Sequence, residues 1–456
     1  MSQQAGRQMH LVGMVNPPTS QYAENWRDPL GRSDWLSGRF YADLARTLER
    51  GCFDMIFFAD ALAVPEDGDG DYGTTLRTAG KGSIYLDPIT TVSLAAGATT
   101  RIGLGATIST SFVPPYAIAR QLLSVDHLSG GRVAWNIVTS TTDAEARNMG
   151  HESIDPPGAR YDRADDVVQT VIDLWNSWEP GALVHDRESG LFADPSRVHR
   201  VREELRLPGA HGDGVADGLS RGPLTLPRSP QGHPVLMQAG SSPRGRAFAA
   251  RWAEVVFAVG DSEEGMRALR EELRERARVD HGRDPDSIRV LQGVQPVVGW
   301  TDADAEAKLR MLRNRIDPAE ALVKLARLLH ADDLDPQALA VDVLAAHRGA
   351  TGSMGFEDML AAVSTQRGFT VADLAIEQAL NQLHPQVVGS PATVADRLGH
   401  LYLSGAADGF IVFPALYHSS FEDFVAGVVP ELQCRGIFRT GYTGATLREH
   451  LGYRLH

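Results

Sequence analysis

Residues 238–243 (QAGSSP) bring together small residues, hydroxyl groups and the start of a helix, a combination suited to phosphate binding. A predicted strand ends at the glutamine, and Ala239 and Gly240 then permit close approach of the backbone to a ligand. Ser241 and Ser242 supply hydroxyl groups, and the proline after them is favoured in the first turn of a helix. Free N–H groups at such a helix start bind anions. The pattern is equally typical of a well-capped turn without a ligand, so both interpretations stay open on local grounds.

Three further polar residues lie at the ends of other predicted strands: Asp60, Thr107 and Asn136. Taken singly, Asp60 could cap the following turn, while Thr107 and Asn136 are each more typical of hydrogen-bonded structural groups. Together with residues 238–243 they mark four strand ends. If these ends meet at one place, their polar residues form a site.

Two more candidates, His151 and Tyr161, follow the strand that contains Asn136. An imidazole can exchange protons near neutral pH, so His151 is a candidate acid or base. A single histidine is nevertheless more often structural than catalytic. His127 is discounted because it lies in a predicted helix on the outside of the fold. The other histidines considered are His10, His384 and His418.

The elements that carry these residues alternate between strand and helix. Strands are predicted at residues 9–15, 53–59, 102–107, 133–138, 234–238, 254–259, 288–298 and 409–413. Near-continuous apolar runs such as FDMIFFA are typical of parallel strands buried on both faces. Eight strands with intervening helices is the count of a (β/α)8 TIM barrel, whose chemistry lies at the carboxyl ends of the strands.

Two segments interrupt the alternation. Residues 179–231 are rich in Pro, Gly, Arg and His, and residues 301–385 form an Ala/Leu/Asp-rich helical stretch. An unstructured loop of this length would be unusual, so the first segment is expected to pack on the barrel. We therefore predict one α/β barrel domain over residues 1–456, with insertions at about 179–231 and 301–385.

Composition excludes several classes of function. The formal net charge of −14 argues against nucleic acid as a partner. The two cysteines, Cys52 and Cys434, lie far apart and form no metal-ligand spacing, and the acidic run at residues 67–71 lacks the spacing of a calcium loop, so no metal site is predicted. No apolar run approaches the ~20 residues of a membrane helix, and the polar start is unlike a signal peptide. A soluble cytoplasmic protein without membrane association is expected.

Long ordered blocks of the sequence carry a family resemblance. They lie at residues 114–140, 159–175, 222–257 and 430–452. They resemble the two-component flavin monooxygenases of the bacterial luciferase-like superfamily, in the group of nitrilotriacetate and dibenzothiophene-sulfone monooxygenases. The resemblance implies a barrel that binds reduced FMN supplied by a separate NAD(P)H:flavin reductase. Reduced flavin then reacts with O2 to form a C4a-(hydro)peroxide, which oxygenates a small organic substrate. It also implies a homodimer or homotetramer.

The same resemblance assigns residues to the site. The FMN phosphate is assigned to Ala239, Gly240, Ser241, Ser242 and Tyr161, the flavin ring to Asp60, Thr107 and Asn136, and catalysis to Asn136 and His151. Residues 15–25, residues 66–83 and the eighth strand (DGFIVFP) depart from the family pattern on the substrate side, which leaves the substrate open. Two alternatives are a deazaflavin-dependent oxidoreductase of the same superfamily and a non-catalytic flavin-binding protein.

Overall fold

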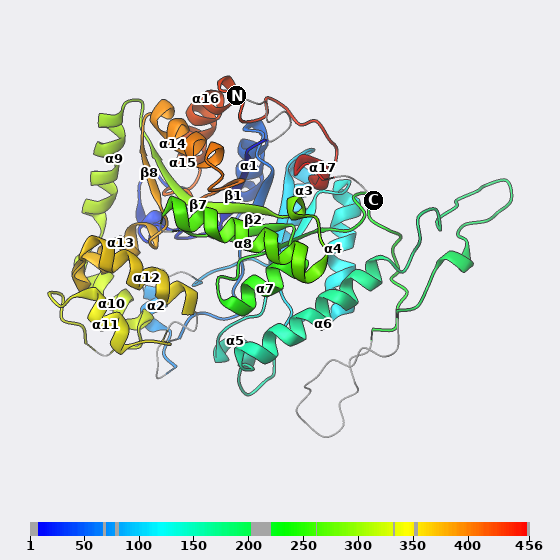
Figure 1. Cartoon of the computed structure of the whole chain (residues 1–456), viewed down its shortest axis with the longest axis horizontal. Coiled ribbons are helices and arrows are strands. Elements are labelled where there is room, and N and C mark those ends of the chain that lie inside the picture. The colour runs from blue at the N-terminus through cyan, green and yellow to red at the C-terminus, as the bar shows by residue number, and fades with distance from the viewer. Residues whose placement is uncertain are drawn as a thin grey trace.

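Eight parallel strands close into a barrel in the computed structural model of this chain (Figure 1). Neighbouring strands pair in chain order from β1 to β7, and β9 pairs with both β7 and β1 to close the ring. The strands are β1 (His10–Val15), β2 (Met55–Phe58), β3 (Gly103–Ser109), β4 (Val133–Val138), β5 (Val235–Gln238), β6 (Val255–Ala258), β7 (Arg289–Val298) and β9 (Gly409–Val412). The predicted (β/α)8 barrel is confirmed.

The structure describes residues 8–66, 70–77, 82–201, 220–260, 262–331, 333–350 and 354–453. The helices that alternate with the strands are α1 (Gly38–Arg50), α3 (Pro88–Ala98), α4 (Pro115–Ser129), α6 (Pro157–Trp175), α7 (Pro243–Trp252), α8 (Glu263–His281) and α14 (Pro391–Leu403). Shorter helices are α2 (Gly73–Arg77), α5 (Asp143–Asn148), α15 (Ser419–Asp423), the π-helix η4 (Phe424–Val428), α16 (Val429–Cys434) and α17 (Leu447–His450). No helix in these ranges is long and apolar enough to cross a lipid bilayer.

Capping residues fix where several helices begin and end. The Ser37 hydroxyl accepts a hydrogen bond from the Phe40 N–H at the start of α1, and the Asp87 carboxylate accepts one from the Thr90 N–H at the start of α3. Gly130 ends α4 in the left-handed conformation, with φ of 74°. Because these signals are local, the helix boundaries follow closely from the sequence.

A ninth strand, β8 (Gln386–Gly389), lies outside the barrel and was not predicted. The first part of β7 pairs with β6 and β9, and its last four residues, from Gln295 to Val298, pair with β8. The extension of β7 beyond the barrel therefore holds the segment that ends the second insertion. The four-residue run QVVG is too short for periodicity to distinguish a strand from a loop.

The second insertion is helical, as predicted, and lies at one side of the barrel (Figure 1). Its helices are α9 (Asp302–Arg315), α10 (Pro318–Leu328), α11 (Ala340–Ala346), α12 (Met354–Arg367) and α13 (Val371–Asn381). Their shared hydrophobic cluster also contains Tyr22 and Leu416, from the loops after β1 and β9. The Tyr22 hydroxyl donates a hydrogen bond to the Leu312 carbonyl oxygen at 3.0 Å. The helical insertion is thus fixed to the carboxyl ends of two barrel strands.

The first insertion, at residues 179–231, was expected to pack on the barrel, and its residues 202–219 lie outside the described part of the chain. After α6 the chain runs away from the barrel (Figure 1), with an antiparallel bridge between Leu183 and Ala193. The described residues that follow return to it, and Trp178 Nε1 donates a hydrogen bond to the Leu224 carbonyl oxygen at 2.7 Å. In the described part of this insertion, the segments next to α6 and next to β5 therefore pack against each other.

An ionic cluster locks the end of the barrel opposite its mouth. The Asp408 carboxylate, just before β9, accepts hydrogen bonds from Arg270 and Arg274 of α8 at 3.0–3.2 Å, and from the Val290 N–H at 3.0 Å. Although burial opposes ionisation, the two arginines hold the pKa of Asp408 well below its usual range. The cluster ties α8, β7 and β9 together.

Replacing Asp408 with asparagine should destabilise the fold by about 3 kcal/mol, because it removes the buried carboxylate of Arg270 and leaves Arg274 with only the exposed Asp286. The free energy of unfolding from urea titrations tests this. Asp286→Asn is the matched control, since Asp286 contacts the same Arg274 with its side chain 76% exposed. It should cost less than about 1 kcal/mol. Equal losses in the two variants would contradict a special role for the buried carboxylate.

Candidate active site

Thr107 and Asn136, each two residues before the end of its strand, form a direct pair near the mouth of the barrel. They lie side by side in the β3–β4 register, and Asn136 Nδ2 donates a hydrogen bond to Thr107 Oγ1 at 3.1 Å. Thr107 Oγ1 in turn donates to the Phe58 carbonyl oxygen at 2.9 Å. Both side chains are buried, and Asn136 Oδ1 has no hydrogen-bond partner among the described residues. A buried acceptor of this kind calls for a donor from a ligand or water.

Gln238, the last residue of β5, adds a second buried amide. Its side chain is 4% exposed, and Oε1 has no hydrogen-bond partner within the described part of the chain. Because Asn136 pairs with Met237, Gln238 lies one residue farther along β5 and its side chain faces the other side of the sheet. A Cβ atom on Gly240 would lie 2.2 Å from Gln238 Nε2, so this amide lies at the turn after β5. The sequence marked Gln238 only as the end of a strand, since nothing local shows that its amide is buried.

The turn after β5 is built around two glycines in close contact. A Cβ atom on Gly240 would lie 2.9 Å from Tyr161 Oη and 3.0 Å from the Gly245 Cα atom, so no larger residue fits without a shift. The Ser242 hydroxyl accepts a hydrogen bond from the Gly245 N–H at 3.0 Å and caps α7, while Ser241 is exposed. The structure therefore brings Tyr161 to the predicted phosphate turn.

Arg244 lies near this turn, but its guanidinium is paired with two carboxylates. Its Nη2 lies 2.9 Å from Asp162 Oδ1 and 2.6 Å from Asp165 Oδ2, and its guanidinium lies 5.4 Å from the Tyr161 ring centroid. Burial raises the pKa of Tyr161, so its phenol is neutral and can donate a hydrogen bond. Anion binding at the turn would therefore depend on N–H and O–H groups.

Asp60 lies at the end of β2 in a half-buried position. Burial, together with the negative charges of Asp87 and Glu145, raises the pKa of its carboxyl to about 6. The Asp60 charge also helps to raise the pKa of Tyr85, which is in contact with Asn16 after β1. Asp60 therefore changes charge close to neutral pH on the side of the mouth formed by β1 and β2.

His151 stands apart from the other predicted residues. Its ring is exposed and packs against Phe112, with ring centroids 5.5 Å apart. No hydrogen bond in the described part of the chain joins it to Asn136 or Tyr161. The structure thus joins Thr107 with Asn136, and Tyr161 with residues 239–242, but leaves His151 outside both groups.

His384 is a mouth residue that sequence reasoning noted without assigning to the site. Its ring lies nearly parallel to Phe257 with centroids 6.2 Å apart, and 4.3 Å from the ring of Phe413. A Cβ atom on Gly293 would meet all three rings at 2.8–3.0 Å. The His384 Nδ1 atom lies 3.1 Å from the Asn381 carbonyl oxygen, which holds the ring in place. Only the unpredicted strand β8 reveals that this histidine reaches the barrel.

Comparison with known proteins identifies the family. The luciferase-like monooxygenase profile matches residues 21–408. The chain is also 42% identical to a dibenzothiophene-sulfone monooxygenase of Rhodococcus erythropolis (strain XP), with 100% of this chain and 98% of that protein covered. The chain belongs to the luciferase-like monooxygenase family. It is therefore a flavin-dependent monooxygenase, as the resemblance implied, rather than a deazaflavin-dependent oxidoreductase or a non-catalytic binding protein.

Two further proteins are similar to this luciferase-like monooxygenase over nearly the full length of both chains. It is 35% identical to nitrilotriacetate monooxygenase component A of Aminobacter aminovorans, over 98% of this chain and 97% of that protein. Its fold matches the crystal structure of the riboflavin lyase RcaE with modified FMN and riboflavin, with a TM-score of 0.84 and 30% identity, covering 98% and 97% of the two chains. Both similarities extend over the whole barrel and its insertions.

The raised pKa of Asp60 gives a direct test of the mouth's electrostatics. Infrared difference spectra between the wild type and Asp60→Asn should show one carboxyl group that is protonated below about pH 6 and ionised above it. Asp87→Asn, which preserves the helix cap, should lower this pKa because it removes a nearby negative charge. Asp396→Asn, at a side chain 75% exposed on α14, should leave it unchanged. A titration near pH 4 would show that Asp60 is solvated.

Proposed function

We propose that this monooxygenase binds reduced FMN across its barrel mouth and uses O2 to oxygenate a small organic molecule. The phosphate would lie at residues 239–242 beside Tyr161, and the ring beside Asp60, Thr107 and Asn136. The observation that carries the proposal is the buried, unsatisfied amide oxygen of Asn136, together with the turn after β5 that two glycines keep narrow.

The turn fits a phosphate because its polar groups come from the backbone and from small side chains. Gly240 and Gly245 let the chain approach closely, and the exposed Ser241 offers a hydroxyl and an N–H beside the start of α7. The neutral Tyr161 phenol, within reach of Gly240, would donate to a phosphate oxygen. The arginine of this turn is neutralised by two carboxylates, so it would add little attraction.

The strand ends fit the polar edge of a flavin ring. Asn136 presents an amide oxygen that needs a donor, and the ring of a reduced flavin carries N–H groups. With Nδ2 fixed by Thr107, Asn136 keeps its oxygen toward the mouth. Reduced FMN, when bound, supplies the electrons that activate O2. The protein's own part is to orient the ring, to exclude water and to hold protons at defined atoms.

Proton transfer at the mouth has two proposed participants. Asp60, with its pKa near 6, can hold or release a proton at the working pH. His151 remains a second proposed acid or base, and its exposed ring would have to turn inward from its contact with Phe112. Asn136 is proposed to orient the reacting part of the flavin.

A second protein is proposed to supply the reduced flavin. One relative carries the name component A of nitrilotriacetate monooxygenase, which indicates an enzyme made of more than one protein. We infer a separate NAD(P)H:flavin reductase that delivers reduced FMN by diffusion. The homodimer or homotetramer implied by the resemblance also stays a prediction.

Replacing Ser241 with leucine should weaken FMN binding at least tenfold, because a bulky apolar group would cover the N–H and hydroxyl groups of the turn. Fluorescence quenching of FMN gives the affinity. Ser93→Leu, at an exposed position of α3, is the matched control and should bind FMN like the wild type. An unchanged affinity in Ser241→Leu would remove the phosphate from this turn.

Replacing Asn136 with alanine should reduce the kcat/KM of oxygenation about tenfold, which corresponds to one lost hydrogen bond to the flavin. The assay is substrate-dependent O2 consumption with FMN, NADH and a flavin reductase, over a panel of sulfones, thioethers and aminopolycarboxylates. The melting temperature of the variant is the control for folding. A fully active variant would exclude Asn136 from the site, and no O2 consumption with any substrate would leave the proposed function without support.

A further inference from the structure

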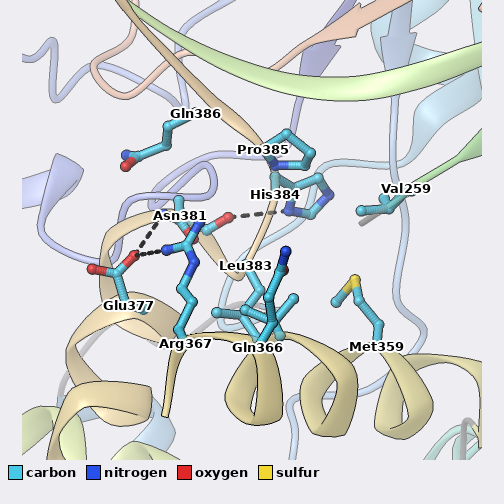
Figure 2. Close-up of a pocket in the computed structure, with 12 residues that line it drawn as sticks. Val259, Met359, Gln366, Arg367, Glu377, Asn381, Leu383, His384, Pro385 and Gln386 are labelled. Carbon is cyan, nitrogen blue, oxygen red and sulfur yellow. Dashed lines mark hydrogen bonds and ion pairs between the residues drawn. The ribbon is translucent and has the colours of Figure 1, made fainter. Parts of the chain in front are cut away.

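A pocket of about 130 Å3 lies between the helical insertion and the barrel mouth (Figure 2). It is lined by residues that follow β6, by residues of α12 and α13, and by the segment that leads into β8. We call it the insertion pocket. Its position beside β6 places it one strand away from the phosphate turn after β5.

One wall of the insertion pocket is apolar and continuous with the barrel. It is formed by Val259, Met359, Val363 and Leu383, together with His384. The His384 ring rests on Phe257 and Phe413, which point into the barrel mouth. A molecule in this pocket would therefore touch a ring that also packs against the interior of the barrel.

The opposite wall is organised by one buried carboxylate. The carboxylate of Glu377, a residue 6% exposed, lies 2.5 Å from Arg313 Nη1. It also lies 3.3 Å from Asn381 Nδ2 and 3.7 Å from Arg367 Nη1 (Figure 2). Two guanidinium groups thus share one carboxylate, which leaves a net positive charge. Arg367 lines the pocket with its side chain 56% exposed, so its charge stays accessible to an anion entering from solvent.

Asn381 adds a specific hydrogen-bond requirement. Its side chain is 3% exposed and lines the pocket, and Oδ1 has no hydrogen-bond partner among the described residues. Because Nδ2 is bound to Glu377, the amide is held with its oxygen as an acceptor. A ligand that satisfies this oxygen must carry an N–H or O–H donor.

We propose that the insertion pocket binds the substrate, and that the substrate is a small organic acid with a hydrogen-bond donor beside its acidic group. Arg367 would bind the acid, Asn381 Oδ1 would accept from the donor, and the His384 wall would contact the apolar part. The pocket is close in size to the ~150 Å3 cavity that holds one benzene ring, so the enclosed part of the substrate is about one ring. This proposal rests on the proposed monooxygenase function.

Calorimetric titration of the full-length protein with three single-ring probes tests the proposal. Mandelate has an acid and an adjacent hydroxyl, phenylacetate has only the acid, and mandelamide lacks the charge. Mandelate should bind most tightly. Arg367→Gln should weaken mandelate binding at least tenfold while leaving mandelamide unchanged, and Asn381→Leu should abolish the preference for mandelate over phenylacetate.

Arg348→Gln is the matched control, because Arg348 pairs at 2.8 Å with exposed Asp358 and does not line the pocket. It should bind mandelate like the wild type. Equal affinity for the three probes, no binding of any of them, or equal effects of Arg348→Gln and Arg367→Gln would overturn the proposal. FMN affinity measured on the same samples separates the two proposals. A protein that binds FMN but not mandelate would contradict only the insertion pocket, and one that binds mandelate but not FMN would contradict only the proposed flavin site.

Discussion

Closure of the barrel depends on a contact that only glycine permits. Where β9 meets β1, a Cβ atom on Gly409 would lie 2.0 Å from the His10 carbonyl oxygen. The adjacent Asp408 is held by two arginines of α8. Gly409 therefore sets the distance between β9 and β1, and Asp408 sets the position of β9 along the barrel. All eight carboxyl ends come to one mouth only because this joint forms, and the polar residues of the mouth gain their proximity from it.

Much of the fold could be predicted from the sequence because its signals are local. The strand at residues 133–138 and the helix at residues 243–252 have their predicted bounds, since the strand follows a pair of glycines and the helix begins with a serine cap and a proline. The segment after α6 and the strand β8 were beyond such reasoning, because their structure depends on contacts with distant segments. Four residues of β8 become a strand only beside an overlong β7.

Less of the candidate site than of the fold could be predicted from the sequence. Strand-end position alone selected Thr107 and Asn136, which do form a hydrogen-bonded pair. The contact of Tyr161 with the turn at Gly240 came from family resemblance, because nothing in their spacing brings residues so far apart together. The buried amide of Gln238 was missed, since whether a side chain has its partners is a property of the folded protein.

The extension of β7 restricts where the helical insertion can change in length. The ladder from Gln295 to Val298 fixes the level at which Gln386 enters β8, and hence where His384 lies over the barrel. Adding or deleting one residue between His384 and β8 would shift the histidine by ~3.3 Å and reverse the side that it faces. Residues farther back in the helical insertion carry no such restriction. The segments that connect the earlier helices of the insertion can therefore change in length while the histidine keeps its place.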